Sequence, residues 1–189
     1  MPAWVVDLLN RLNSTFVVDG RWQWFVSGLG YTLLISLFSV LLGLVIGILM
    51  ALMRLSKSKI LRAVSGIYID IIRGTPTTVQ LLIMWSGILA TCKNSVLIAS
   101  LTFGINSGAY VAEIVRAGIL AVDKGQMEAG RSLGLNKFQT MRYIIIPQAF
   151  KSILPPLGNE FIVLIKETSI IGYIGMMDLT KGAMLIQSR

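Results

Sequence analysis

The chain has 189 residues, of which 54% are hydrophobic and only 14% are charged. Soluble domains usually carry about 25% charged residues, so this composition argues against a water-soluble fold and favours one membrane-embedded domain. The formal net charge is +8, but the basic residues fall in clusters between apolar runs, which excludes a nucleic-acid-binding face. With no His and a single Cys, Cys92, the chain cannot form an internal disulfide, and we expect no metal site and no cofactor.

Residues 1–21 come before the first long apolar run. They lack the basic start, the apolar stretch and the small-residue cleavage site of a signal peptide. Asp7 and Arg11 lie four residues apart among apolar side chains. This spacing predicts a short amphipathic helix at the extracytoplasmic membrane interface.

Residues 22–189 are predicted to form one all-α transmembrane domain, because a helix satisfies its own backbone hydrogen bonds in lipid. The first apolar run has no charge from Trp22 to Met53, whereas about 20 apolar residues are enough to cross a bilayer. The second run is interrupted between Asp70 and Pro76. The four predicted spans cover about residues 24–53, 63–91, 95–119 and 143–168.

Two basic clusters set the predicted orientation. The first, RLSKSKILR, follows the first span, and the second lies in the polar segment 122–142 before the last span. Cytoplasmic loops carry an excess of Lys and Arg, so both clusters are expected on the cytoplasmic side of a bacterial cytoplasmic membrane. The N-terminus and the tail after residue 168 are then expected outside.

Small residues recur every four positions in two of the predicted spans, which lets another helix approach closely. The two stripes are Ser39, Gly43, Gly47 and Ala51 in the first span, and Gly104, Gly108 and Ala112 in the third. We favour packing within the chain over a dimer seam. The neighbouring Asn106 and Ser107 could contact a substrate or form interhelical hydrogen bonds, and the residues leave both interpretations open.

The stretch EAGRSLGLNKFQTMRYIIIP, residues 128–147, is polar and basic between two apolar runs. Gly134 is placed to end a first short helix, and Asn136 with Gln139 has the spacing of a capping box that begins the next. A short exposed helix at a membrane surface is what a partner with a groove would hold. An ordinary solvated loop is equally consistent with these residues.

This stretch resembles the EAA loop of ABC importer permeases, in which EAA is followed by three residues, Gly, nine residues and I-x-L-P. The spacing matches throughout, with Gly in place of the third EAA residue and Ile146 in place of Leu. The matching positions are Glu128, Ala129, Gly130, Gly134, Ile144 and Pro147. The resemblance implies that this loop is the coupling helix that docks on an ATPase subunit.

Four further blocks resemble the polar amino acid branch of these permeases. They are RGTPTTVQLLI from Arg73, NSGAYVAEIVRAGI from Asn106, KGQMEAGRSLG from Lys124 and LPPLGNEFIVLIKETSI from Leu154. The resemblance implies a MetI-like bundle that pairs with a second permease subunit, binds two ATPase subunits and receives its solute from an extracytoplasmic binding protein. The implied solutes are glutamine, glutamate, arginine, histidine, cystine and similar polar amino acids.

One departure concerns the number of spans. Members of the family usually continue past the region of Asp178, Leu179 and Thr180 into one more membrane helix, so five spans are implied where four are predicted here. The chain also has no G-x-x-x-x-G-K-[ST] loop, so ATP hydrolysis is expected of a partner and this subunit is expected to be non-catalytic.

The candidate solute path is based on charges inside the predicted spans. Glu160 and Glu167 are seven residues apart and share one helix face, and ionisable groups at such depth usually face a cavity or a charged partner. Pairing with Arg73 or Lys166 is an equally open alternative. The broken second span could offer free backbone groups to a carboxylate, which makes Arg73, Thr75 and Asn159 the remaining candidates.

Two other function classes are compatible with parts of the sequence. An ion-driven secondary transporter would explain carboxylates inside the membrane without an ATPase, but four spans are few and the EAA-like loop would have no purpose. A membrane anchor or assembly factor would explain the short chain, and it predicts that neither Glu160 nor Glu167 affects any solute. The sequence favours the ABC permease.

Overall fold

The computed structural model describes residues 2–187, and every regular element in that range is helical. The all-α prediction is therefore confirmed. In chain order the elements are α1 (Ala3–Leu12), η1 (Asn13–Val17), η2 (Val18–Gly20), α2 (Trp22–Arg54), α3 (Lys59–Arg73), α4 (Thr77–Ile83), η3 (Met84–Ile88), α5 (Ser95–Leu120), α6 (Lys124–Ser132), α7 (Lys137–Thr140), η4 (Met141–Ile145), α8 (Ile146–Glu167), η5 (Thr168–Ile174) and α9 (Leu179–Gln187).

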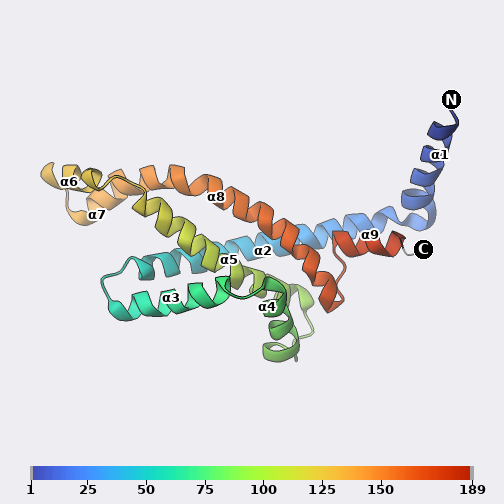
Figure 1. Cartoon of the computed structure of the whole chain (residues 1–189), viewed down its shortest axis with the longest axis horizontal. Helices are drawn as coiled ribbons and strands as arrows, with labels where there is room; N and C mark the ends of the chain where they lie inside the picture. Colours follow the sequence, from blue (N-terminus) through green and yellow to red (C-terminus); the bar gives the residue numbers. More distant parts are fainter. Residues whose placement is uncertain (1, 188–189) are drawn as a thin grey trace.

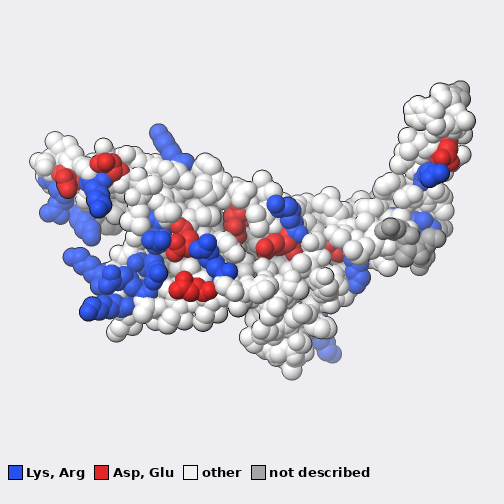
Figure 2. Space-filling view, in the orientation of Figure 1, with Lys and Arg blue, Asp and Glu red and all other residues white. Residues whose placement is uncertain are grey.

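The helices form an elongated bundle around α2 and α5 (Figure 1). Helix α5 packs against both α2 and α8. One end of the bundle carries α6, α7 and the turn between α2 and α3, while α1 and α9 lie near the other end. Lys and Arg side chains gather at the α6 end (Figure 2), as the two basic clusters of the sequence predict.

Two of the described helices, α2 and α5, are long and apolar enough to cross a membrane. Only 28% of the most apolar 18-residue window of α2 is buried, and large side chains such as Leu37, Phe38 and Leu41 point outwards. A water-soluble protein would bury such a surface. In lipid, helices associate through their small residues instead, and this is the pattern of α2.

The small-residue stripe of α2 faces α5. Ser39, Gly43, Gly47 and Ala51 are all buried in this contact. A Cβ added to Gly47 would lie 2.5 Å from the Cβ of Val111, and one added to Gly104 would lie 2.6 Å from Leu42 Cδ2. The two backbones therefore approach at a distance that only glycine allows, and the interpretation as packing within the chain is confirmed.

The second predicted span consists of two pieces that meet at a bend. Helix α3 begins at Lys59, earlier than predicted, because the Ser58 hydroxyl accepts a hydrogen bond from the Leu61 N–H and caps the helix. It ends at Arg73, and α4 resumes after Pro76 in another direction. Pro76 has no N–H group with which to extend the hydrogen bonding of α3, and its ring disfavours a helical conformation at Thr75.

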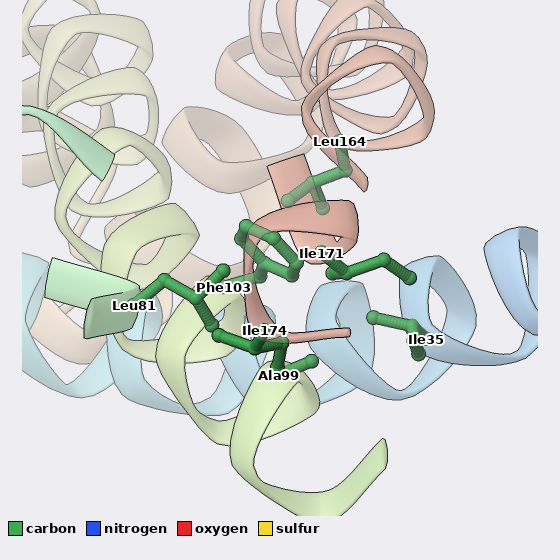
Figure 3. Close-up of a cluster of buried hydrophobic side chains, with 7 residues drawn as sticks. All are labelled: Ile35, Leu81, Ala99, Phe103, Leu164, Ile171 and Ile174. Carbon is green, nitrogen blue, oxygen red and sulfur yellow. The ribbon is translucent and has the colours of Figure 1, made fainter. Parts of the chain in front are cut away.

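An apolar cluster joins five segments beside this bend. The buried side chains are Ile35, Leu81, Ala99, Phe103, Leu164, Ile171 and Ile174 (Figure 3). They come from α2, α4, α5, α8 and η5. The cluster packs these five segments together in the half of the bundle that lies away from α6.

The segment after residue 168 is largely helical. It forms η5, turns at Gly175 with φ of +78°, and continues as α9 against α2. The buried Asp178 carboxylate caps α9 by accepting hydrogen bonds from the Thr180 and Lys181 N–H groups, at 3.1 and 2.9 Å. Helix α9 thus begins at Leu179, where the family resemblance implies one further helix.

Candidate functional site

The EAA-like stretch forms two short helices joined by a fully hydrogen-bonded turn. Gly134 has φ of +85°, and its N–H group donates to Arg131 O while Leu135 N donates to Gly130 O, both at 3.1 Å. These two bonds are the Schellman motif that closes helix α6. Asn136 and Gln139 then form both bonds of a capping box, at 2.9 and 3.0 Å, which confirms the prediction of a helix, a turn and a second helix.

Gly130 is the contact point between α6 and the helix that follows. It is buried, and an added Cβ would lie 2.5 Å from Thr140 Cγ2 and 3.0 Å from Ile144 Cδ1. Glycine in place of the third EAA residue therefore leaves room for the Thr140 side chain. Residue Ile144 of the pattern packs against Gly130 rather than facing solvent.

We expect Gly130→Ala to loosen α6, although alanine is the better helix former by about 1 kcal/mol. The new methyl group overlaps a β-branched side chain, and overpacking of this kind costs about 1–3 kcal/mol. Thr140→Ser removes only the methyl group and keeps the hydroxyl that donates to Asn136 O, so the double variant should recover the lost order. Amide hydrogen exchange across residues 124–145 would measure it, and protection unchanged in the single variant would contradict the expected clash.

The outer surface of this segment carries large apolar side chains. Leu133 is 81% exposed and Phe138 is 73% exposed, beside the exposed Glu128 and Ala129. Apolar side chains at the tip of a polar, basic end indicate a surface that another protein covers. Sequence reasoning missed Leu133 and Phe138, although both flank the Gly134 turn in a segment that is otherwise polar.

Two features connect this surface to the long helix α8. The Gln148 side chain donates to Gln126 Oε1 at 3.1 Å and to Ile144 O at 3.0 Å, which joins α6 to the start of α8. The exposed Pro147 lies just after the π-helical turn Met141–Ile145. A wider turn relieves the clash between a proline ring and the preceding carbonyl groups, so the helix continues from α7 into α8 without a break.

A second group of candidate side chains lies inside the bundle, where α4, α5 and α8 meet. Glu160 is only 7% exposed, and the Ser107 hydroxyl lies beside its carboxyl group, although in a geometry that makes no good hydrogen bond. The half-buried Glu167 lies close enough for its charge to interact with that of Glu160, and Thr77 lies beside it. The two predicted carboxylates thus lie about two turns apart on one face of α8.

No ion pair reaches either carboxylate within residues 2–187. The alternative of pairing with Arg73 or Lys166 is therefore not what the structure has. Arg73 instead places its guanidinium over the Tyr110 ring, 5.1 Å from the centroid. It lines an open cavity of about 440 Å³ together with Glu113 and Ser152, and Glu113 forms an ion pair with Arg116 at 2.8 Å.

Side chains of the bend between α3 and α4 satisfy carbonyl groups at the end of α3. The Thr75 hydroxyl donates to Ile71 O at 3.0 Å, and Gln80 Nε2 donates to Ile72 O and to Thr75 Oγ1, both at 2.8 Å. Asn106 in turn donates to Gln80 Oε1 at 3.1 Å. Asn106 thus forms an interhelical hydrogen bond, one of the two interpretations that the sequence left open.

Gln80 is the residue of this region that sequence reasoning missed. A single amide in the run TVQLLI was the available signal. Two other predicted path residues remain. Asn159 is exposed and adjacent to Glu160 on α8. The Thr75 hydroxyl donates its hydrogen bond to Ile71 O within the bend.

Comparisons with known proteins agree with this arrangement. Residues 43–188 match the family model described as the binding-protein-dependent transport system inner membrane component. A putative glutamine transport system permease protein of Rickettsia bellii is 48% identical over 164 residues, which cover 85% of this chain and 75% of the relative.

Two solved structures share the fold. The crystal structure of an amino acid ABC transporter with histidines matches with a TM-score of 0.81 and 49% identity, over 88% of this chain and 78% of that chain. An inward-facing structure of the MetNI methionine ABC transporter matches with a TM-score of 0.74 over 87% of this chain and 81% of that chain. At 22% identity, the second match shows the fold alone, and it confirms the expected MetI-type bundle. The chain belongs to the family of binding-protein-dependent transport system inner membrane components, and it is a non-catalytic permease subunit of an amino acid ABC importer.

Proposed function

We propose that this permease carries a polar amino acid of the class that includes glutamine, glutamate, arginine, histidine and cystine. The observation that carries the proposal is Glu160, a carboxylate 7% exposed inside the bundle without an ion pair in the described range. A buried charge without a partner is costly. The α-ammonium group of an amino acid would supply that partner, and the Rickettsia bellii relative is named for glutamine transport.

The proposed path passes the two carboxylates of α8 and then the charged cavity beside Arg73. The solute would meet Glu167 and Glu160 first and then enter the cavity beside Arg73 and Glu113. The guanidinium of Arg73 would receive its α-carboxylate. With four spans and the N-terminus outside, the α6 end would lie in the cytoplasm, and the Lys and Arg side chains gathered there support this orientation (Figure 2).

Membership of the family implies an ATPase and a solute-binding protein as partners. We propose that the full assembly contains two ATPase subunits and a second permease, either the same chain or a sister chain. The ATPase would grip the surface formed by Glu128, Ala129, Leu133 and Phe138. The hydrogen bond between Gln126 and Gln148 would pass its movement to α8.

Uptake into proteoliposomes tests the proposed solute class. The permease, its ATPase and its binding protein are reconstituted together, and entry of labelled glutamine, glutamate, arginine, histidine and cystine is measured with and without ATP. We expect ATP-dependent uptake of at least one of them. Uptake driven by an ion gradient without ATP, or transport of apolar amino acids only, would contradict the proposal.

Co-purification of the permease with its ATPase tests the coupling surface. Glu128→Arg reverses a charge on that surface, and Gly134→Asp puts a side chain on a left-handed turn, which costs about 1–2 kcal/mol. We expect each variant to recover no more than about a tenth of the ATPase bound by the wild type, a loss of about 1.4 kcal/mol. Lys57→Glu, a charge reversal in the turn between α2 and α3, is the control and should bind normally. Equal recovery from all variants would mean that the ATPase grips another surface.

A further inference from the structure

Three arginines meet in an open pocket that the transport path does not use. Arg54 ends α2, Arg62 lies in the first turns of α3, and Arg116 lies near the end of α5. Together they line a cavity of about 580 Å³, with Leu55 and Leu120 on its wall. The pocket thus combines three cationic groups with apolar side chains.

Two of the three guanidinium groups are held in place. Arg54 Nη1 donates to Arg62 O at 3.0 Å, and the group lies over Gly66, where an added Cβ would overlap Arg54 Nη1. Arg116 is held by Glu113 through Nε and Nη2, and its Nη1 takes no part in that contact. Glu113 balances only one of the three charges, and residues 20–69 contain no Asp or Glu.

We propose that this pocket binds the phosphate group of an anionic membrane lipid. Basic pockets between membrane helices on the cytoplasmic side are suited to such headgroups, and guanidinium groups match phosphate geometry. The apolar wall favours a lipid over a soluble anion, because Leu120 is 59% exposed and Leu55 is 36% exposed at the rim. The acyl chains would follow the outward-facing apolar side chains of α2, where Leu52 is 57% exposed.

The depth of the pocket along the bundle also favours a lipid headgroup. It lies where two membrane-spanning candidates, α2 and α5, approach their basic ends, which is the depth of a lipid headgroup. The assignment to the cytoplasmic leaflet rests on the proposed orientation. Binding itself does not, so the test below can succeed or fail independently of transport and of ATPase coupling.

Native mass spectrometry of the purified permease–ATPase complex tests the proposal. The complex is incubated with phosphatidylglycerol, with phosphatidylcholine or with inorganic phosphate, and the bound molecules are counted. We expect the wild type to retain phosphatidylglycerol in preference to phosphatidylcholine. Arg54→Gln and Arg62→Gln should each weaken that binding about fivefold, the effect of one basic residue near anionic lipid.

Two further variants separate a built site from general charge attraction. Gly66→Ala changes no charge but displaces the Arg54 guanidinium, and the flexible end of that side chain can move without disturbing the helices. We expect it to weaken retention of phosphatidylglycerol. Lys57→Gln removes a charge from the same turn but lies outside the pocket lining, and it should have a smaller effect than Arg54→Gln.

Several outcomes would overturn the lipid assignment. Equal losses in Lys57→Gln and Arg54→Gln with none in Gly66→Ala would mean general attraction to an anionic surface. Binding of inorganic phosphate that is lost in the arginine variants, with no difference between the two lipids, would mean a soluble-anion site. Unchanged lipid binding together with weaker recovery of the ATPase would mean that an acidic protein segment occupies the pocket.

Discussion

Replacing Glu160 with glutamine is expected to lower ATP-driven amino acid uptake at least about tenfold, which corresponds to about 1.4 kcal/mol in the transport barrier. Glutamine has nearly the same shape as glutamate, so the packing of this side chain, 7% exposed between α5 and α8, should be kept. What disappears is the negative charge that would meet the α-ammonium group of the solute. The initial rate of uptake of the transported amino acid into proteoliposomes measures the effect.

The matched control for this experiment lies on the same helix. Lys166→Gln also removes one charge from α8, but Lys166 is exposed and lies about 100° around the helix from Glu167. We expect this variant to transport normally, and both variants should bind the ATPase as the wild type does. Normal uptake by Glu160→Gln would remove Glu160 from the path and would leave its burial without a transport role.

The local parts of the coupling surface could be predicted from sequence because they depend on neighbouring residues. A capping box needs only Asn136 and Gln139, and the helix stop needs only the left-handed conformation that Gly134 adopts at φ of +85°. The role of Gly130 could not be predicted in the same way. The general rule counts glycine as a weakness within a helix, whereas here it accommodates Thr140, and that contact exists only after the chain has turned back.

The interior of the bundle shows the same limit. Sequence spacing placed Glu160 and Glu167 on one face of α8, but it could not tell that Arg73 stacks on Tyr110 rather than pairing with either carboxylate. Nor could it show that Gln80 closes the bend before Pro76, where its side-chain amide donates to Ile72 O and Thr75 O. These are contacts between separate helices, and they depend on how the bundle closes.

The seam between α2 and α5 supports the candidate solute path. It brings Gly43 against Ser107, which lies beside Glu160, and Gly47 against Val111. Small residues make this approach possible in lipid, where large apolar side chains gain nothing by meeting each other. A substitution that separates the two helices should therefore affect the stability of the chain before it affects the path.

We expect Gly47→Val to be the most destabilising single substitution considered for this chain. An added Cβ would lie 2.5 Å from both Cβ and Cγ1 of Val111 and 3.0 Å from Gly108 O, so the helices must separate at a cost of about 3 kcal/mol or more, the upper part of the range for overpacking. For a chain of this size, that corresponds to a loss of about 6–12 °C in the unfolding midpoint. Thermal unfolding in detergent measures the change.

Two control variants test whether the lower unfolding midpoint comes from the contact between α2 and α5. Gly30 lies on the same helix with nothing within 4 Å of an added Cβ, so Gly30→Val should leave the midpoint nearly unchanged. Exchanging the pair, with Gly47→Val and Val111→Gly in one chain, conserves the volume at the contact and should recover part of the loss, because volume-conserving exchanges are tolerated best. If Gly30→Val were as destabilising as Gly47→Val, the cause would be valine within the helix. If the exchange recovered nothing, the contact with Val111 would not be what limits the approach of α2 to α5.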